Sequence, residues 1–198
     1  MAIVGTVDSF AENPVRTVIC THYQEDHLGA NAWYATRGAR VMGHEHLAAE
    51  ALCDTTIAAI QKLQPAHSRT DIAVLIPAAN TLLAGDLIEV VAYPFIDWWA
   101  GGSLEGMIQE VDRIAGWAQG DQRIVPGHGP VIGAAELAEY EKMLVTVRGR
   151  ARAALERGDT EEQFLDSRPT REFDAGRGGE AAGPQFASLV WYGLSRGD

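Results

Sequence analysis

The feature that most constrains this chain is the heptapeptide THYQEDH at residues 21–27, which directly follows an apolar, strand-like run at residues 15–20. His22, Asp26 and His27 place two imidazoles and a carboxylate within six residues. Histidine nitrogen and aspartate oxygen suit a divalent ion such as zinc, and a loop at a strand's end can turn alternate side chains toward one point. A lone histidine would carry little weight, because most are surface or core residues with satisfied hydrogen bonds. The heptapeptide therefore predicts a metal site.

Three later segments repeat this placement of a histidine or aspartate beside small residues. They are QPAHS at residues 64–68, LAGD at 83–86 and VPGHGP at 125–130. In each, an apolar or strand-like run delivers His67, Asp86 or His128 into a turn of small residues. Turns rich in glycine and proline are also ordinary loops, so none of the three is decisive alone. Their repetition favours one site that all four segments share.

In their order along the chain, these motifs resemble the signature of the metallo-β-lactamase superfamily: His-x-His-x-Asp-His, then a histidine, an aspartate and a last histidine. The resemblance covers residues 15–130. It implies an αββα four-layer sandwich of the α/β (α+β) class, with metal ions at one edge between the sheets. It also implies the metal ligands: His22 and His67 for a first ion, Asp26, His27 and His128 for a second, and Asp86 as the carboxylate that bridges the two.

Gln24 stands where the superfamily has its second histidine. A neutral amide oxygen is a much poorer zinc ligand than imidazole, so we expect weaker binding at the first site. Two alternatives stay open: weak coordination by Gln24, or a single metal. The single metal, which we favour, would be held by Asp26, His27, His128 and Asp86. The expected cofactor is Zn²⁺, as one or two ions, with Mn²⁺ or Fe²⁺ as alternatives.

The segment ahead of the signature is short for this superfamily, whose members usually carry several more strands there. Only residues 3–10 (IVGTVDSF) are available, with Asp8 in the place of the usual aspartate-containing turn. The spacing between His46 and His67 is also short, as if a hairpin were missing. We therefore expect a shortened N-terminal sheet with an exposed edge, which would invite pairing with a second copy. A homodimer is the expected assembly.

The length of 198 residues favours a single domain over residues 1–198, and the alternation of short strand-like runs with helical periodicity predicts a layered one. Asp159 and Glu162 resemble a capping pair for a short helix. The predicted strands lie at residues 15–20, 40–43, 71–76, 81–84 and 123–125. The predicted long helices lie at residues 103–118 and 134–157, the second ending at Gly158. The remaining segments are a surface loop at 168–184, an apolar segment at 186–194 that docks on the body, and an ambiguous stretch at 44–64 that begins as helix and continues as helix or strand.

Composition narrows the classes of partner. The formal net charge of −11 repels phosphate backbones and acidic membranes, so we expect neither nucleic acid nor a membrane as a partner. No stretch approaches the roughly 18 unbroken apolar residues of a membrane helix, and no basic stretch precedes an apolar run near residue 1. We expect a cytoplasmic protein, although a removed signal peptide would leave the same sequence. Cys20 and Cys53 form neither a disulfide scaffold nor a close metal pair, and Cys20 is expected in the core.

The resemblance predicts a metal-dependent hydrolase that acts on a small molecule. A metal-bound hydroxide would attack an ester, thioester, lactam or phosphoester bond, while Asp26 or Asp86 orients the water or moves its proton. The chain has no Gly-x-Ser-x-Gly elbow, phosphate-binding glycine loop or dinucleotide fingerprint. Two alternatives remain: a non-catalytic binding or interaction module of the same fold, and a metal-dependent lyase or cyclase that acts on a small natural product.

Three further residues have competing interpretations. Trp98 and Trp99 either line a substrate pocket or pack against Trp191 and Tyr192 near the C-terminus. Asp71 is expected to orient a ligand histidine or its loop rather than to bind the metal, as outer carboxylates commonly do.

Overall fold

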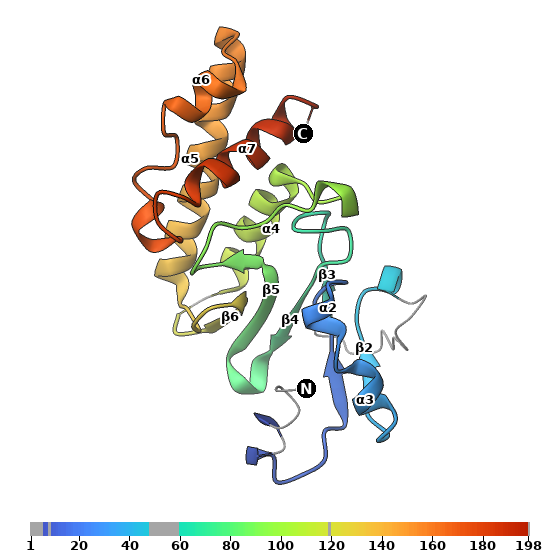
Figure 1. Cartoon of the computed structure of the whole chain (residues 1–198). Helices are drawn as coiled ribbons and strands as arrows, with labels where there is room; N and C mark the ends of the chain where they lie inside the picture. Colours follow the sequence, from blue (N-terminus) through green and yellow to red (C-terminus); the bar gives the residue numbers. More distant parts are fainter. Residues whose placement is uncertain (1–5, 8, 48–59, 119, 198) are drawn as a thin grey trace.

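The computed structural model describes residues 6–7, 9–47, 60–118 and 120–197 (Figure 1). Its strands are β1 (Thr17–Ile19), β2 (Arg40–Met42), β3 (Ile60–Lys62), β4 (Ile72–Ile76), β5 (Thr81–Glu89) and β6 (Arg123–His128). Its α-helices are α2 (Glu25–Leu28), α3 (Asn31–Ala35), α4 (Leu104–Trp117), α5 (Ala134–Arg157), α6 (Glu161–Asp166) and α7 (Gly183–Leu194). Short 3₁₀ helices are η1 (Glu45–Leu47), η2 (Pro77–Ala79), η3 (Trp98–Ala100) and η4 (Asp174–Gly176).

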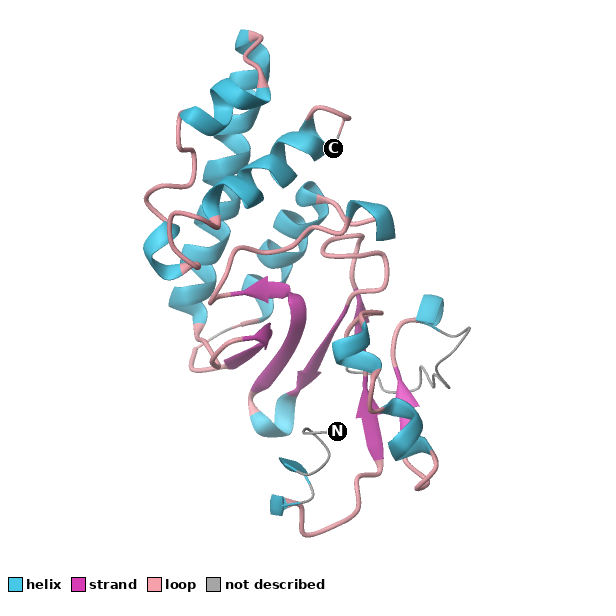
Figure 2. Cartoon of the chain, viewed as in Figure 1, coloured by secondary structure: helices cyan, strands magenta, loops and turns pink. Residues whose placement is uncertain are grey.

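Two sheets and the helices that flank them form an α/β sandwich (Figure 2). The larger sheet has the order β3-β4-β5-β6, with β6 parallel to β5 and the other pairs antiparallel. β1 and β2 form a parallel pair beside it, and the Ile72 N–H donates to the Thr21 carbonyl (2.9 Å) where the two sheets meet. Helices α4, α5 and α7 lie on one side of the larger sheet, while α3 lies against β2 on the other (Figure 1). The predicted fold class is confirmed, and the described N-terminal sheet is small, as expected.

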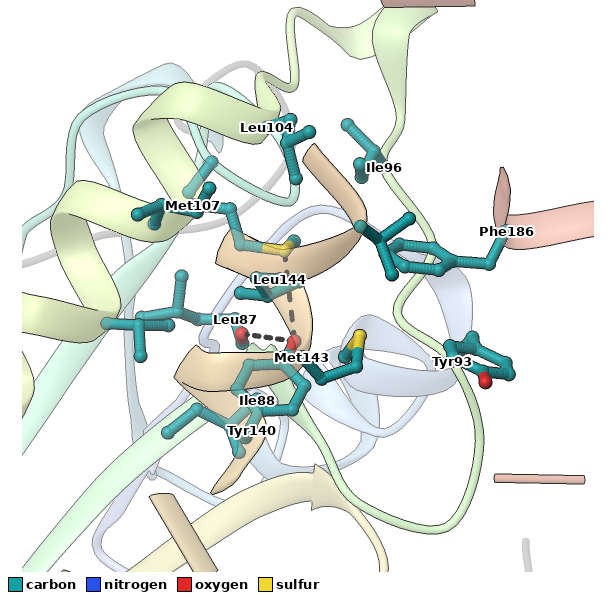
Figure 3. Packing of buried hydrophobic residues seen from close by; sticks show 14 of the residues in the cluster. Leu87, Ile88, Tyr93, Ile96, Leu104, Met107, Tyr140, Met143, Leu144 and Phe186 are labelled. Carbon is teal, nitrogen blue, oxygen red and sulfur yellow. Dashed lines mark hydrogen bonds between the residues drawn. The ribbon is translucent and has the colours of Figure 1, made fainter. Parts of the chain in front are cut away.

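The main core fills the space between the larger sheet and helices α4, α5 and α7. Leu104, Met107 and Val111 of α4 are fully buried there, as the helical spacing of the apolar residues predicts. Tyr140 of α5 lies among them, and its hydroxyl donates to the Leu87 carbonyl of β5 at 3.0 Å (Figure 3). Apolar packing and a buried hydrogen bond therefore both fix α5 to the strand that carries Asp86.

Strands β5 and β6 extend beyond the apolar runs that predict them. β5 continues through Asp86 to Glu89, and β6 reaches His128. The register between the two strands shifts on both sides of Gly85, which marks β-bulges. Gly85 has a φ of +56°, and a Cβ at this position would lie 2.6 Å from the Cβ of Thr21. Only glycine therefore lets β5 pass so close to the chain at Thr21.

The two predicted long helices are confirmed as α4 and α5. The predicted short helix after α5 is present as α6, but its predicted cap, Asp159 with Glu162, is wrong by one residue. Thr160 and Gln163 form the capping box instead, with the Thr160 N–H donating to Gln163 Oε1 at 2.8 Å. The Asp159 carboxylate accepts a hydrogen bond from Arg157 Nη2 at 2.6 Å, so it is engaged on the side of α5.

The segment at residues 168–184 is more firmly held than a surface loop. It contains turns and η4, and its Thr170 and Asp174 side chains are buried. The hydroxyl of Tyr93 donates to Asp174 Oδ1 at 2.6 Å, which ties the segment to the loop after β5. The apolar segment that follows is confirmed as docked, because Phe186 and Val190 of α7 are buried in the main core.

Some predictions fall partly or wholly outside the described residues. Asp8 and Cys53 lie there, as does the middle of the ambiguous stretch, of which η1 and β3 are described. The described residues of the segment at 3–10 are helical, so they add no strand to the N-terminal sheet. Within the described part of the chain, no helix combines the length and the apolar character needed to cross a membrane.

The buried Tyr140 hydroxyl provides a test of this packing. Replacing Tyr140 with Phe removes the hydrogen bond to the Leu87 carbonyl, so we expect the free energy of unfolding to fall by about 1–3 kcal/mol. Denaturant titration measures the change. The matched control is Tyr34→Phe, since the Tyr34 side chain is also buried and its hydroxyl has no hydrogen-bond partner among the described residues. Equal losses in the two variants would show that the Tyr140 hydrogen bond does not stabilise the core.

Candidate metal centre

The side chains predicted to bind a metal reach one place from four parts of the chain. His22 lies in the bend after β1, and His67 lies in the turn between β3 and β4. Asp86 is in the middle of β5, and His128 is the last residue of β6. Asp26 and His27 lie on the short helix α2, rather than on the loop at a strand's end that the sequence suggested.

These side chains form two groups that are each close enough to hold one ion. The first group is His22, His67 and Asp86; the second is Asp26, His27 and His128. Within each group the candidate ligand atoms all lie within 4.8 Å of one another. The grouping agrees with the two ligand sets implied by the sequence resemblance, and it includes all of those six residues.

Asp86 lies between the two groups. Its Oδ2 is 3.5 Å from His22 Nε2, and its Oδ1 is 3.3 Å from His27 Nε2. Its Oδ2 is also 3.7 Å from His128 Nε2. One carboxylate thus faces histidines of both groups, as a bridging ligand must.

Contacts on the far side of the imidazoles determine where their lone pairs point. His67 Nδ1 lies 2.8 Å from the Phe95 carbonyl oxygen, which can only accept, so Nδ1–H donates and Nε2 carries the lone pair. The hydroxyl of Thr21 lies 3.1 Å from His22 Nδ1 and 3.4 Å from His27 Nδ1. Thr21 therefore contacts one histidine of each group and leaves both Nε2 atoms facing inward.

Several of these inward atoms make no hydrogen bond. His27 Nε2, His67 Nε2 and Asp86 Oδ1 are buried and form none within the described part of the chain, although His27 Nε2 and Asp86 Oδ1 face each other at 3.3 Å. A buried polar atom without a partner costs about 1–3 kcal/mol. Nitrogen and carboxylate oxygen are ligands that Zn²⁺ prefers, so a divalent cation in contact with them would offset this cost. The residues present fit a metal.

Burial also keeps His22 suitable as a ligand. It lowers the pKa of His22 to about 4, although the nearby Asp86 carboxylate acts in the opposite direction. The imidazole is therefore neutral near pH 7, which is the form that binds a metal.

Gln24 occupies the N-cap position of α2, but its side chain makes no cap hydrogen bond. Its Oε1 instead lies 3.1 Å from His22 Nε2, so the amide faces the first group. Gln24 Oε1 and His22 Nε2 both carry lone pairs, so at this separation they can share either a proton, as a hydrogen bond, or a metal cation that both bind. The first group thus contains an amide oxygen where the superfamily signature has an imidazole.

The turn that carries His67 is held by its neighbours. Asp71 accepts hydrogen bonds from the Ser68 N–H at 2.8 Å and from the Ser68 hydroxyl at 2.6 Å. Asp71 therefore shapes the turn, in agreement with its predicted supporting role. Burial raises the pKa of Asp71 to about 6, although the Ser68 hydrogen bonds oppose this shift. On the other side, the Asp97 N–H donates to the His67 carbonyl at 2.9 Å.

Sequence reasoning missed a link between the first metal segment and the loop after β5. The Tyr23 hydroxyl donates to the Asp97 carboxylate, and this hydrogen bond is the main reason why the pKa of Tyr23 rises to about 12. The Tyr23 N–H donates to Thr70 Oγ1 at 3.1 Å. The partners are far apart in sequence, so no local pattern could have indicated these contacts.

The tryptophan pair packs against Tyr192, as one of its two interpretations predicts. The Trp98 ring lies 6.3 Å from the Tyr192 ring and occupies the space where a side chain at Gly193 would be. Trp99 also lies beside Tyr192, with the rings stacked at 6.1 Å, but it remains largely exposed. Cys20 is buried in a small core with Val41, as predicted.

Comparison with known proteins identifies the fold. No protein-family profile matches the sequence, and no curated protein does. The metallo-β-lactamase FIM-1 from Pseudomonas aeruginosa, solved in a mono-zinc form, matches with a TM-score of 0.60 and 19% identity over 72% of each chain. The metallo-β-lactamase from Pontibacter korlensis matches with a TM-score of 0.58 and 21% identity, over 73% of this chain and 75% of its own. The chain has the metallo-β-lactamase fold.

A third structure agrees. The metallo-β-lactamase from Hirschia baltica matches with a TM-score of 0.59 and 18% identity, over 72% of this chain and 74% of its own. The metallo-β-lactamase fold thus recurs at low sequence identity, and the chemistry of this chain has to be argued from its own side chains.

Gly127 of β6 allows a test of the bridging carboxylate in this metallo-β-lactamase fold. A Cβ at Gly127 would lie 1.8 Å from Asp86 Oδ1, so Gly127→Ala must displace the Asp86 side chain. We expect the affinity for Zn²⁺ to fall by about 10–100-fold, as for other changes that disturb ligand orientation. Competition with a chromophoric chelator measures it.

The matched control is Gly149→Ala on α5, where a Cβ meets nothing within 4 Å. This variant should retain the original Zn²⁺ affinity and gain about 0.5–1 kcal/mol of stability from helix propensity. If both variants bind Zn²⁺ equally well, Asp86 is not a ligand.

Proposed function

We propose that this protein is a zinc-dependent hydrolase that cleaves an ester, thioester, lactam or phosphoester bond of a small molecule. One observation carries the proposal: the two groups of candidate ligands each bring their ligand atoms within 4.8 Å of one another, and among these atoms His27 Nε2, His67 Nε2 and Asp86 Oδ1 are buried and make no hydrogen bond within the described residues. Solved proteins of the same fold are metallo-β-lactamases, one of them in a mono-zinc form, which supports metal-dependent hydrolysis and Zn²⁺ as the ion.

The second group is proposed as the stronger site. It has two imidazoles and the Asp26 carboxylate, with Asp86 at its border. The first group has two imidazoles and shares Asp86, but its further donor is the amide oxygen of Gln24. Because an amide oxygen is the poorer zinc ligand, the second group should fill first. Partial occupancy of the first group follows at higher Zn²⁺ concentrations.

A divalent ion held by these residues would supply an acidified water and would polarise the scissile carbonyl or phosphoryl group. Asp26 is proposed as the residue that orients the attacking water and accepts its proton, because its side chain is 57% exposed and so open to substrate, whereas that of Asp86 is 12% exposed. Asp86 fixes the positions of the histidines on both sides. In thioester hydrolysis, water oxygen bonds to the acyl carbon, the C–S bond breaks, and the thiol leaves with a proton.

The two alternatives remain as outcomes of the tests. A non-catalytic module would retain little metal and show no turnover. A lyase or cyclase would bind metal and fail on every hydrolytic substrate. The homodimer expected from the small N-terminal sheet, and the cytoplasmic location, stay predictions.

Metal retention depends most directly on His128. The His128→Ala variant removes a ligand of the stronger group, so elemental analysis after dialysis should find less than 0.1 zinc per chain, a loss exceeding the roughly 10–100-fold effects of outer contacts. The unaltered protein should retain about one zinc per chain, and chelation should abolish its turnover of a panel of ester, thioester, lactam and phosphodiester substrates. The control is Glu139→Ala, a change to an exposed carboxylate on α5. Equal zinc content in His128→Ala and the unaltered protein would refute the assignment.

The role of Gln24 can be tested separately. The Gln24→His variant restores an imidazole to the first group, so the zinc content should rise from about one toward two ions per chain. Isothermal titration resolves the added site as a second binding event that His67→Ala removes. A single event in both Gln24→His and the unaltered protein would mean that the first group is incapable of binding for reasons other than Gln24.

A further inference from the structure

An open pocket of about 610 Å³ lies between the loop after β5 and helix α7. Its size is within the range typical of small-molecule sites. The residues that line it are uncharged, and they include the large apolar or aromatic side chains of Phe95, Trp99, Leu189 and Tyr192. The chain has a net charge of −11, so an uncharged pocket of this size differs in character from a surface rich in acidic residues.

Phe95 connects this pocket to the candidate metal centre. Its carbonyl oxygen accepts the hydrogen bond from His67 Nδ1 at 2.8 Å, and its ring lies 6.3 Å from the His67 ring in an edge-on arrangement. Its side chain also lines the pocket. One residue, Phe95, therefore contacts the proposed metal ligand His67 and also lines the pocket.

The pocket is exposed, and the loop on one side of it packs against α7. Trp99 is 72% exposed and Phe95 is 45% exposed, which is a large aromatic surface to leave in contact with water. Beneath them, Trp98 fills the space at Gly193, where a Cβ would lie 2.1 Å from its Cη2 atom. Trp98 therefore joins the loop that carries the exposed rings to α7.

We propose that this pocket binds the uncharged alkyl or aryl group of the substrate while the metal centre acts on the adjacent bond. The inference rests on the proposed function and adds the substrate class: acyl compounds with an apolar acyl group. An anionic group would find no cation among the lining residues; Arg196, which is not one of them, lies over the Tyr192 ring, 4.0 Å from its centroid. A small acetyl group would leave the pocket empty.

The experiment is a chain-length series with the zinc-loaded protein. Acetyl, butyryl and hexanoyl thioesters of one small polar thiol are compared by kcat/KM. Each methylene that enters the pocket should raise kcat/KM about fourfold. The benzoyl thioester should also exceed the acetyl compound, whereas a succinyl thioester, which is charged, should not.

The variants compare the slope of this series rather than the absolute rate. Trp99→Ala should reduce the increase per methylene to less than twofold. Phe10→Ala is the matched control, because Phe10 is an equally exposed aromatic residue (71%) that does not line the pocket, and it should keep the fourfold slope. A flat series in the unaltered protein, or a preference for the succinyl compound, overturns the proposal.

A binding measurement without metal separates this inference from the proposed function. Octanamide and acetamide are titrated into the chelated protein while tryptophan fluorescence is followed. Octanamide should bind at least tenfold more tightly than acetamide, and Trp99→Ala should lose this difference. If octanamide binds more tightly but no thioester is hydrolysed, the apolar pocket is supported and the hydrolase is rejected. If thioesters are hydrolysed but kcat/KM does not change with chain length and the two amides bind equally, the hydrolase is supported and the apolar pocket is rejected. If Trp99→Ala converts a dimer to a monomer in sedimentation and the series is flat, the pocket is a contact between copies, which also overturns the proposal.

Discussion

The structure depends on bringing inward-facing donor atoms from four separate segments into one buried space. Three of these atoms make no hydrogen bond within the described residues, and a buried polar atom left without a partner costs about 1–3 kcal/mol. That cost is an appreciable fraction of the net stability of about 5–15 kcal/mol of a typical domain. Packing elsewhere must therefore hold the donors in place, and cation binding would add to folding stability because it offsets that cost. The core around Tyr140 and the support of the His67 turn by Asp71 are the parts that do this holding.

Close approach of backbones makes the arrangement possible. Gly85 lets β5 pass against Thr21, whose hydroxyl contacts His22 and His27, and Gly127 leaves room for the Asp86 carboxylate. A side chain at either glycine would occupy the space of a candidate ligand or of its support. The small residues beside the histidines and aspartates in the sequence are therefore part of the site and not merely loop residues.

The sequence contained the donor set but not its supports. His22, His67, Asp86 and the other predicted ligands converge because each follows a strand or interrupts one, and this placement is visible in apolar runs and turns. The long helices were predictable for a similar reason, since their apolar residues repeat with helical spacing. The full extent of β5 was not predictable, because Gly85 and Asp86 interrupt the apolar pattern that indicates a strand. The contact between Tyr23 and Asp97 was also invisible, since it joins residues 74 positions apart and depends on the tertiary fold.

Phe95 links recognition to the metal centre through two different parts of the same residue. Its carbonyl oxygen fixes the His67 tautomer, and its ring lines the apolar pocket. Asp97, two residues later, binds the His67 backbone and the Tyr23 hydroxyl, so the same loop also holds the segment that bears His22. A ligand that moves the Phe95 ring must therefore either leave its backbone in place or change the orientation of His67. The packing of Trp98 of this loop against Gly193 and Tyr192 of α7 favours the first outcome, in which an apolar group is bound without disturbing the imidazole that faces the metal site.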